Sequence, residues 1–196
     1  ILPTLSFVAT ANAILYNEAI PIFLDSSEKN FCLDENKLEN YLRNETILKK
    51  GKRYSKHNRK LISAIIPTHV FGSCCNIEKI VKIGKKYSIS IVEDCAEGLG
   101  AFYRKKHLGT FGDIGILSFN GNKIITSAGG GAVLVNSKKN FDFISLIGNV
   151  AKSNHPIELY NVDIGYNYKM PNFNASLGFS QFNKINKFLK YKKNLN

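Results

Sequence analysis

Two stretches in the middle of the chain carry side chains that could do chemistry together. A short apolar run ends in two carboxylates, Glu93 and Asp94, and a second apolar run, residues 114–119, carries Ser118 and leads into a polar turn with Lys123. Open α/β sheets hold their ligands at the carboxyl ends of the strands. A carboxylate and a lysine in such places suit pyridoxal phosphate, because the amine forms a Schiff base with the cofactor and the carboxylate keeps the pyridine nitrogen protonated.

Taken singly, each residue also has an ordinary explanation. A lone aspartate at a strand end commonly caps a turn, and a lone lysine is commonly a solvated surface group. The wider segment decides between the two interpretations. It reads V-E-D-C-A-E-G-L-G-A-F-Y-R-K-K-H-L-G-T-F-G-D-I-G-I-L-S-F-N-G-N-K-I-I-T-S-A-G-G-G over residues 92–131. It resembles, without a gap, the heart of the DegT/StrS-type sugar aminotransferases, which are pyridoxal phosphate enzymes of the aspartate-aminotransferase fold type.

The resemblance implies a role for each of a small set of residues. Lys123 would be the Schiff-base lysine and the catalytic proton shuttle, and Asp94 would face the pyridine nitrogen. Ala96 would let the cofactor ring lie flat, and Glu97 would reach its phenolic oxygen. Ser118, five residues before Lys123, would donate to the cofactor phosphate.

A second segment extends the resemblance to a partner subunit. Residues 163–172 read D-I-G-Y-N-Y-K-M-P-N, and the family supplies an asparagine of a similar segment to the phosphate of the partner's site. Asn167 would be that residue, which implies a homodimer. Lys169 stands where the family has arginine, and a lysine cannot reproduce a bidentate grip. Cys95 stands where alanine is usual.

His69 lies in a loop, P-T-H-V-F-G at residues 67–72, that also resembles the family. It could face the cofactor pocket or hold the loop in place, and we favour the structural role. The four cysteines, Cys32, Cys74, Cys75 and Cys95, lack the spacing of a zinc site. We therefore expect free thiols, no metal and a cytoplasmic protein.

Hydrophobic patterning predicts an α/β fold with a three-layer, mainly parallel sheet flanked by helices. The purely apolar run 61–66 suits a buried parallel strand, and the following helix and the strand ending at Asp94 complete a right-handed strand–helix–strand unit. Further strands are expected at residues 5–8, 19–24 and 132–135. Helices are expected to begin at Asp34 or Asn36, at Asn76, at Ser137 or Asn140, and at Asn174, with Thr10 or Asn12 capping a short early helix.

Composition limits the other possibilities. The chain has 196 residues and a formal net charge of +12, with no apolar run long enough to span a membrane. The basic run 49–60 could contact nucleic acid, but no known nucleic-acid-binding pattern accompanies it, and a solvated loop explains it more simply. A mildly basic surface would also suit an anionic sugar nucleotide.

These observations predict a cofactor-binding large domain over residues 1–196, without the family's N-terminal phosphate-binding part and C-terminal small domain. The expected reaction moves an amino group from glutamate to a nucleotide-linked keto-sugar, for surface polysaccharide or nonulosonic acid synthesis. Two alternatives stay open: a non-catalytic remnant or basic binding module, and a sugar dehydrase-like member. Lys123 argues against the dehydrase, because those enzymes resemble this chain but carry histidine there. We expect the 196-residue piece alone to be inactive.

Overall fold

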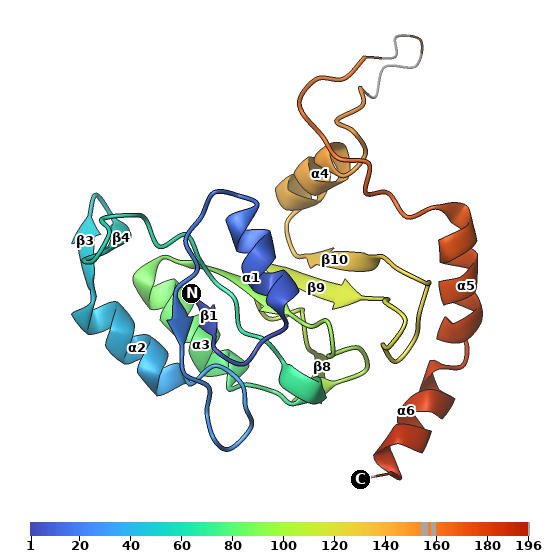
Figure 1. Ribbon diagram of the computed structural model, residues 1–196, viewed down its shortest axis with the longest axis horizontal. Coiled ribbons are helices and arrows are strands. Elements are labelled where there is room, and N and C mark those ends of the chain that lie inside the picture. The colour runs from blue at the N-terminus through green and yellow to red at the C-terminus, as the bar shows by residue number, and fades with distance from the viewer. Residues whose placement is uncertain (154–156, 158–159, 196) are drawn as a thin grey trace. The chain divides into compact units, whose positions relative to one another are not determined.

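The computed structural model describes residues 1–153, 157 and 160–195. The chain divides into two compact units (Figure 1). Unit 1 comprises Ile1–Ser118 and Ala132–Leu134, and unit 2 comprises Phe119–Gly131 and Val135–Asn196. Of the helices in the described part of the chain, none combines the length and apolar character that a membrane span needs.

The elements alternate between helices and short strands. The helices are α1 (Val8–Leu15), α2 (Glu35–Asn44), α3 (Ile77–Tyr87), α4 (Lys138–Ile147), α5 (Asn172–Phe182) and α6 (Ile185–Lys193), with a short 3-10 helix at Val70–Gly72. The strands are β1 (Leu2–Pro3), β2 (Phe23–Leu24), β3 (Thr46–Lys49), β4 (Lys52–Ser55), β5 (Ala64–Ile65), β6 (Ser90–Asp94), β7 (Phe102–Tyr103), β8 (Lys106–His107), β9 (Ile114–Ser118) and β10 (Gly131–Val135).

A four-stranded sheet in the order β10-β9-β6-β5 forms the centre of unit 1. Strand β6 runs parallel to β5, with Ile65 opposite Ile91, and parallel to β9, with Asp94 opposite Ile116. This confirms the predicted strand–helix–strand unit that ends at Asp94. The expected strand at residues 61–66 is reduced to Ala64–Ile65, although Ile62 is also buried.

Helices lie on both faces of β6. A Cβ atom on Gly84 of α3 would lie 2.7 Å from Cδ1 of Ile91, so α3 packs closely on the face to which Ile91 points. Thr10 of α1 contacts the side chain of Asp94. Side chains alternate along a strand, so Ile91 and Asp94, three residues apart, point to opposite faces. The predicted layered α/β arrangement is therefore confirmed.

The core of unit 1 forms between this sheet and helices α2 and α3. Helix α2 begins after Asp34, whose Oδ1 accepts hydrogen bonds from the N–H groups of Asn36 at 2.8 Å and Lys37 at 3.0 Å. Asn76 caps α3 in the same way. Both caps confirm sequence predictions, since short polar side chains satisfy the first N–H groups of a helix. The helices bury one face each, lined by Leu38, Leu42, Ile77, Ile80 and Ile83.

The predictions for the first 24 residues are partly wrong. No strand forms at residues 5–8: the ladder with β2 ends where Thr4 donates to the carbonyl of Leu24, and α1 begins at Val8. The second strand, expected at 19–24, is limited to Phe23–Leu24. Thr10 does not cap α1, because it lies inside the helix and its hydroxyl contacts Asp94 instead.

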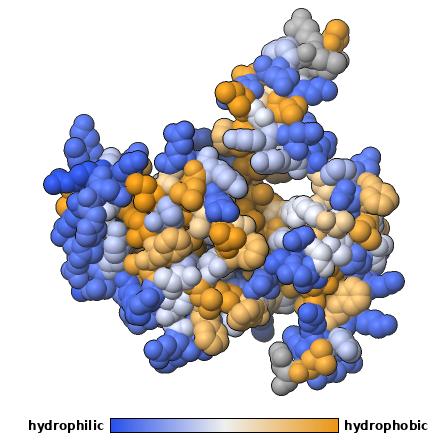
Figure 2. Space-filling model, viewed as in Figure 1, coloured by the Kyte–Doolittle hydropathy of each residue, from blue (hydrophilic) through white to orange (hydrophobic). Residues whose placement is uncertain are grey.

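The basic run is a hairpin as well as a loop. Strands β3 and β4 pair antiparallel, with Leu48 opposite Arg53, and lie beside α2 (Figure 1). Hydrophilic side chains gather over this hairpin (Figure 2). Alternation along this run gave no clear strand period, because the lysines on both strands are exposed whichever face they occupy.

Unit 2 contains three helices. Helix α4 begins after Ser137, whose Oγ accepts from the N–H of Asn140, as predicted. The single helix expected from Asn174 is two helices, α5 and α6, interrupted at residues 183–184. Neither α5 nor α6 buries a residue among those described. Without such burial the apolar pattern has no tertiary packing to keep the helix continuous.

Candidate active site

Asp94 lies at the carboxyl end of β6 and its main chain is held from two sides. Its N–H donates to the carbonyl of Pro67 at 2.9 Å, and its carbonyl accepts from the N–H of His69 at 3.0 Å. The next residue, Cys95, donates to the carbonyl of Ile116 on β9 at 2.9 Å. The loop after β5 and strand β9 thereby fix the position at which the Asp94 side chain leaves the sheet.

The carboxylate of Asp94 is oriented as firmly as its backbone. Only 9% of the residue is exposed. Oδ2 accepts a hydrogen bond from the hydroxyl of Thr10 at 2.6 Å, and Oδ1 accepts from the N–H of Ala96 at 3.1 Å. A carboxylate offers about four acceptor sites. These two bonds therefore direct the group and leave it able to accept a further N–H, such as that of a pyridinium ring.

Glu97 is anchored by a loop in an unusual conformation. Its Oε2 accepts from the N–H of Phe71 at 2.6 Å. Phe71 has a φ of 55°, the left-handed region that non-glycine residues rarely adopt, and its side chain is largely exposed. Such strained positions cluster at functional sites. Ala96 lies between Asp94 and Glu97 and is half-buried.

Ser118 is the last residue of β9 and is half-buried. Because β9 places Ile116 opposite Asp94, Ser118 lies two residues farther along the neighbouring strand. Unit 1 thus gathers Asp94, Ala96, Glu97 and Ser118 at the carboxyl ends of two adjacent parallel strands, where the sequence placed them.

Lys123 belongs to unit 2, in a loop that closes on itself. The N–H of Phe119 donates to the carbonyl of Gly130, and the N–H of Ser127 donates to the carbonyl of Phe119, both at 2.9 Å. Gly130 has a φ of 95°, which explains why the turn after the lysine is rich in glycine. Lys123 is half-buried, and its N–H donates to the carbonyl of Asn120 at 3.1 Å.

Helix α5 fastens this loop through two side chains that the sequence analysis missed. Gln181 accepts from the N–H of Thr126 at 3.1 Å and donates to its carbonyl at 2.8 Å. Asn174 donates to the carbonyl of Ser127 at 2.6 Å. Their polar side chains on an otherwise apolar helix were the available signal.

Asn167, also in unit 2, is exposed. Its neighbours hold it: Tyr166 donates to the carbonyl of Ile147 at 2.6 Å and Tyr168 to that of Gly148 at 3.0 Å. The two tyrosine rings stack with centroids 5.1 Å apart. This arrangement presents the Asn167 side chain from a fixed stretch of backbone.

Glu93 forms a separate, fully buried network on the other face of β6. Its Oε2 lies 3.1 Å from Nε2 of His69 and accepts from the N–H of Gly109 at 2.9 Å. Its Oε1 accepts from the N–H groups of Phe111 at 2.7 Å and Gly112 at 2.6 Å. A carboxylate only accepts, so Nε2 of His69 carries the proton. His69 therefore holds the loop, the role that we favoured for it.

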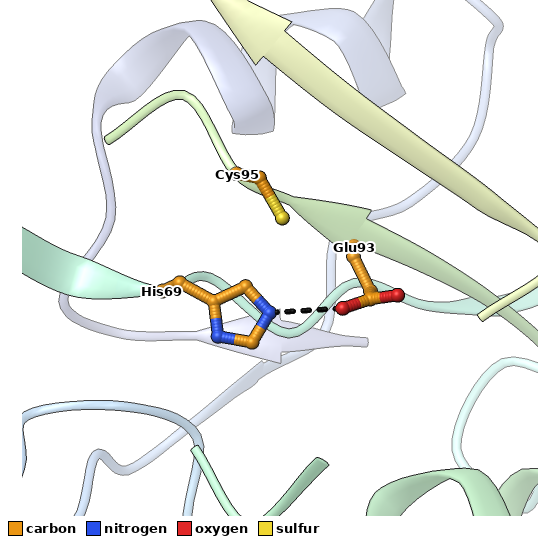
Figure 3. A group of neighbouring side chains, drawn as sticks. All are labelled: His69, Glu93 and Cys95. Carbon is orange, nitrogen blue, oxygen red and sulfur yellow. Dashed lines mark hydrogen bonds and ion pairs between the residues drawn. The ribbon is translucent and has the colours of Figure 1, made fainter. Parts of the chain in front are cut away.

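The same network raises the question of a metal. His69, Glu93 and Cys95 offer ligand atoms within 4.8 Å of one another (Figure 3). However, both carboxylate oxygens already accept N–H donors. Burial, together with the charges of Glu93 and Asp94, raises the pKa of the Cys95 thiol, and a metal binds the thiolate form. The cluster is a hydrogen-bonded structural group rather than a candidate metal centre.

Comparison with known proteins agrees with this geometry. The DegT/DnrJ/EryC1/StrS aminotransferase family matches residues 1–196. The chain is 35% identical over its whole length to 51% of a GDP-perosamine synthase from Escherichia coli O157:H7. It is 30% identical over 96% of its length to 46% of the GDP-perosamine synthase of Caulobacter vibrioides.

A solved structure agrees as well. Helicobacter pylori PseC, described as an aminotransferase involved in the biosynthesis of pseudoaminic acid, superposes with a TM-score of 0.79 at 28% identity. The superposition covers 94% of this chain and 46% of that one. The chain spans about half the length of the relatives that it matches. It belongs to the DegT/DnrJ/EryC1/StrS aminotransferase family.

Proposed function

We propose that the complete protein is a pyridoxal phosphate-dependent aminotransferase that moves an amino group from glutamate to a nucleotide-linked keto-sugar. The observation that carries the proposal is the Asp94 carboxylate, fixed by Thr10 and Ala96 at the carboxyl end of β6 in a chain of this family. An oriented anion at that position is what a protonated pyridine nitrogen requires.

Each candidate residue then has a chemical task. Pyridoxal phosphate supplies an aldehyde that carries the amino group and a ring that accepts electrons from the bond being broken. Asp94 holds the ring nitrogen as a cation, Glu97 contacts the phenolic oxygen, and Ala96 leaves room for the ring. Lys123 binds the cofactor covalently, and its amine takes a proton from the substrate carbon and returns one during the reaction.

The phosphate of the cofactor would be bound by hydroxyl and amide donors. Ser118 supplies one donor from the end of β9. Asn167 supplies another from the partner subunit of a homodimer, a role supported by its exposed side chain on a stretch of backbone held in place. The site would then be complete only in the dimer.

The substrate class follows from the relatives. Two of them are GDP-perosamine synthases, and a structural relative is involved in pseudoaminic acid biosynthesis. We infer a cytoplasmic reaction that produces an amino sugar for surface polysaccharide or nonulosonic acid synthesis. The formal net charge of +12 suits an anionic sugar nucleotide.

The proposal is tested by locating the cofactor and measuring the reaction. The full gene product that carries this chain is incubated with pyridoxal phosphate, reduced with borohydride and mapped by peptide mass spectrometry. We expect the pyridoxyl label on Lys123 and glutamate-dependent amination of a keto-sugar nucleotide. In Lys123→Ala both should be lost, whereas Lys105→Ala, an exposed lysine of the loop between β7 and β8, should keep both.

The outcomes separate the alternatives. Label on another lysine would overturn the assignment of Lys123. A labelled protein that eliminates a hydroxyl from the sugar without amination would favour the dehydrase-like function. Absence of both label and turnover in the full gene product would favour a remnant that kept only the fold.

A further inference from the structure

Helix α1 brings a hydroxyl group to the carboxylate that the proposed function assigns to the cofactor. Thr10 Oγ1 and Asp94 Oδ2 are 2.6 Å apart, although the residues are 84 positions apart in the chain. The hydroxyl must be the donor if Asp94 is ionised, because a carboxylate only accepts. Hydrogen bonds to a charged acceptor are shorter and stronger than neutral ones.

The geometry points to Thr10 as a positioning residue for pyridoxal phosphate, acting through Asp94. This inference rests on the proposed function. The two carboxylate oxygens are held by different elements: Oδ2 by Thr10 of α1, and Oδ1 by the N–H of Ala96 in the following loop. Two anchors on the two oxygens fix the plane of the carboxylate, whereas one would leave it free to rotate about the Cβ–Cγ bond.

The position of Thr10 in α1 supports this role. It is the third residue of the helix, and its own N–H bonds to the carbonyl of Phe7 at 3.1 Å. The first turn of a helix carries partial positive charge, which adds to the attraction for a carboxylate. No residue of α1 is buried, so packing in the core does not explain a threonine at this position.

A plane fixed in advance lowers the cost of binding the ring. A carboxylate that must be reoriented on binding loses conformational freedom at that moment, and that loss weakens affinity. Loss of one hydrogen bond to a charged group corresponds to about a tenfold weaker complex. Thr10 is thus expected to affect how tightly the ring is held, without touching the reacting atoms.

The test uses a double-mutant cycle on ligand affinity. Pyridoxamine 5′-phosphate is the probe, because it has the same ring nitrogen and phosphate but no aldehyde, so its affinity is independent of a covalent bond to Lys123. Its dissociation constant is measured by fluorescence titration of the full gene product as wild type, Thr10→Val, Asp94→Ala and the double variant. Thr10→Ser is the rescue variant, because it retains the hydroxyl.

We expect Thr10→Val to weaken affinity about tenfold in the wild-type background and not at all in the Asp94→Ala background. Thr10→Ser should stay within about twofold of wild type. Thr46→Val is the matched control: its hydroxyl donates to the carbonyl of Leu42 at 2.5 Å, away from Asp94. It should lower thermal stability and leave affinity unchanged.

Three results would overturn the inference. An unchanged affinity in Thr10→Val would show that the hydroxyl is not needed, and an equal loss in both backgrounds would show that it does not act through Asp94. Failure of Thr10→Ser to restore affinity would assign the effect to shape. If the wild type bound neither pyridoxamine phosphate nor pyridoxal phosphate, the proposed function would fail together with the inference.

Discussion

Glu93 and Asp94 are adjacent in the sequence but serve different faces of β6. The pleat of the strand turns their side chains in opposite directions. Asp94 meets Thr10 of α1, whereas Glu93 is fully buried among His69 and the backbone of residues 109–112. One carboxylate is thus oriented for a ligand, and the other organises the loop that leads into β9.

The Glu93 network makes a prediction about stability in acid. Burial raises the pKa of Glu93, but the hydrogen bonds from His69, Gly112 and Gly109 outweigh it and lower the pKa below its ordinary value of 4.5. A carboxylate with a lowered pKa in the folded state stabilises that state fully at higher pH. Its contribution disappears as the pH falls through the folded-state pKa.

We therefore expect Glu93→Gln to lower the free energy of unfolding by about 3 kcal/mol near neutral pH, because an amide places its own N–H₂ against backbone donors. The difference from wild type should narrow as the pH is lowered below about 4.5. Urea denaturation of the full gene product at several pH values measures it. Glu39→Gln, at an exposed ion pair with Lys86, is the control and should change little. A difference that is independent of pH would contradict this account.

At the scale of elements, α3 approaches β6 through a glycine. Gly84 is buried, and a Cβ atom there would lie 2.7 Å from Cδ1 of Ile91 and 2.9 Å from the carbonyl oxygen of Ile89. The second atom belongs to the backbone and cannot move aside cheaply. The close packing of α3 on the sheet thus depends on the missing side chain, and the sheet in turn positions Asp94.

Gly84→Ala should accordingly destabilise the protein by about 2 kcal/mol, despite the higher helix propensity of alanine. Adding Ile91→Val, which removes the Cδ1 atom, should restore part of the loss, since only the contact with the carbonyl of Ile89 would remain. Thermal unfolding of the two variants measures both effects. A stabilising Gly84→Ala would show that α3 can shift away from β6 without cost.

At the scale of the whole molecule, the two units differ in how much apolar surface they cover. Unit 1 has a contiguous core that includes Leu38, Ile65 and Ile80. In unit 2, α5 and α6 bury none of their described residues, and large side chains such as Phe173, at 81%, and Tyr191, at 66%, are exposed. Orange side chains on these helices are visible in Figure 2.

This surface predicts how residues 1–196 behave when they are expressed alone. Large exposed apolar patches promote association, so we expect the piece to self-associate or aggregate and to show no measurable transamination. Size-exclusion chromatography with light scattering, followed by the glutamate-dependent assay, measures both. A monodisperse, yellow and active 196-residue protein would contradict the prediction.

Several features followed from the sequence because they depend on local chemistry. Asp34, Asn76 and Ser137 cap helices as predicted, since a cap needs only a short polar side chain and nearby N–H groups. The strand ending at Asp94 and the parallel strand–helix–strand unit followed from apolar runs. The candidate residues Ser118 and Lys123 came from resemblance, and their chemical roles stay predictions.

Other features were decided only by the tertiary structure, because they join residues that are distant in the chain. The bond from Thr10 to Asp94, the burial of Glu93 under His69, and the hold of Gln181 on the lysine loop carry no local pattern. The short strand β1 and the break between α5 and α6 were missed for a related reason. Pairing with β2 sets where β1 ends, and the absence of burial among the described residues of α5 and α6 lets an apolar pattern divide into two helices.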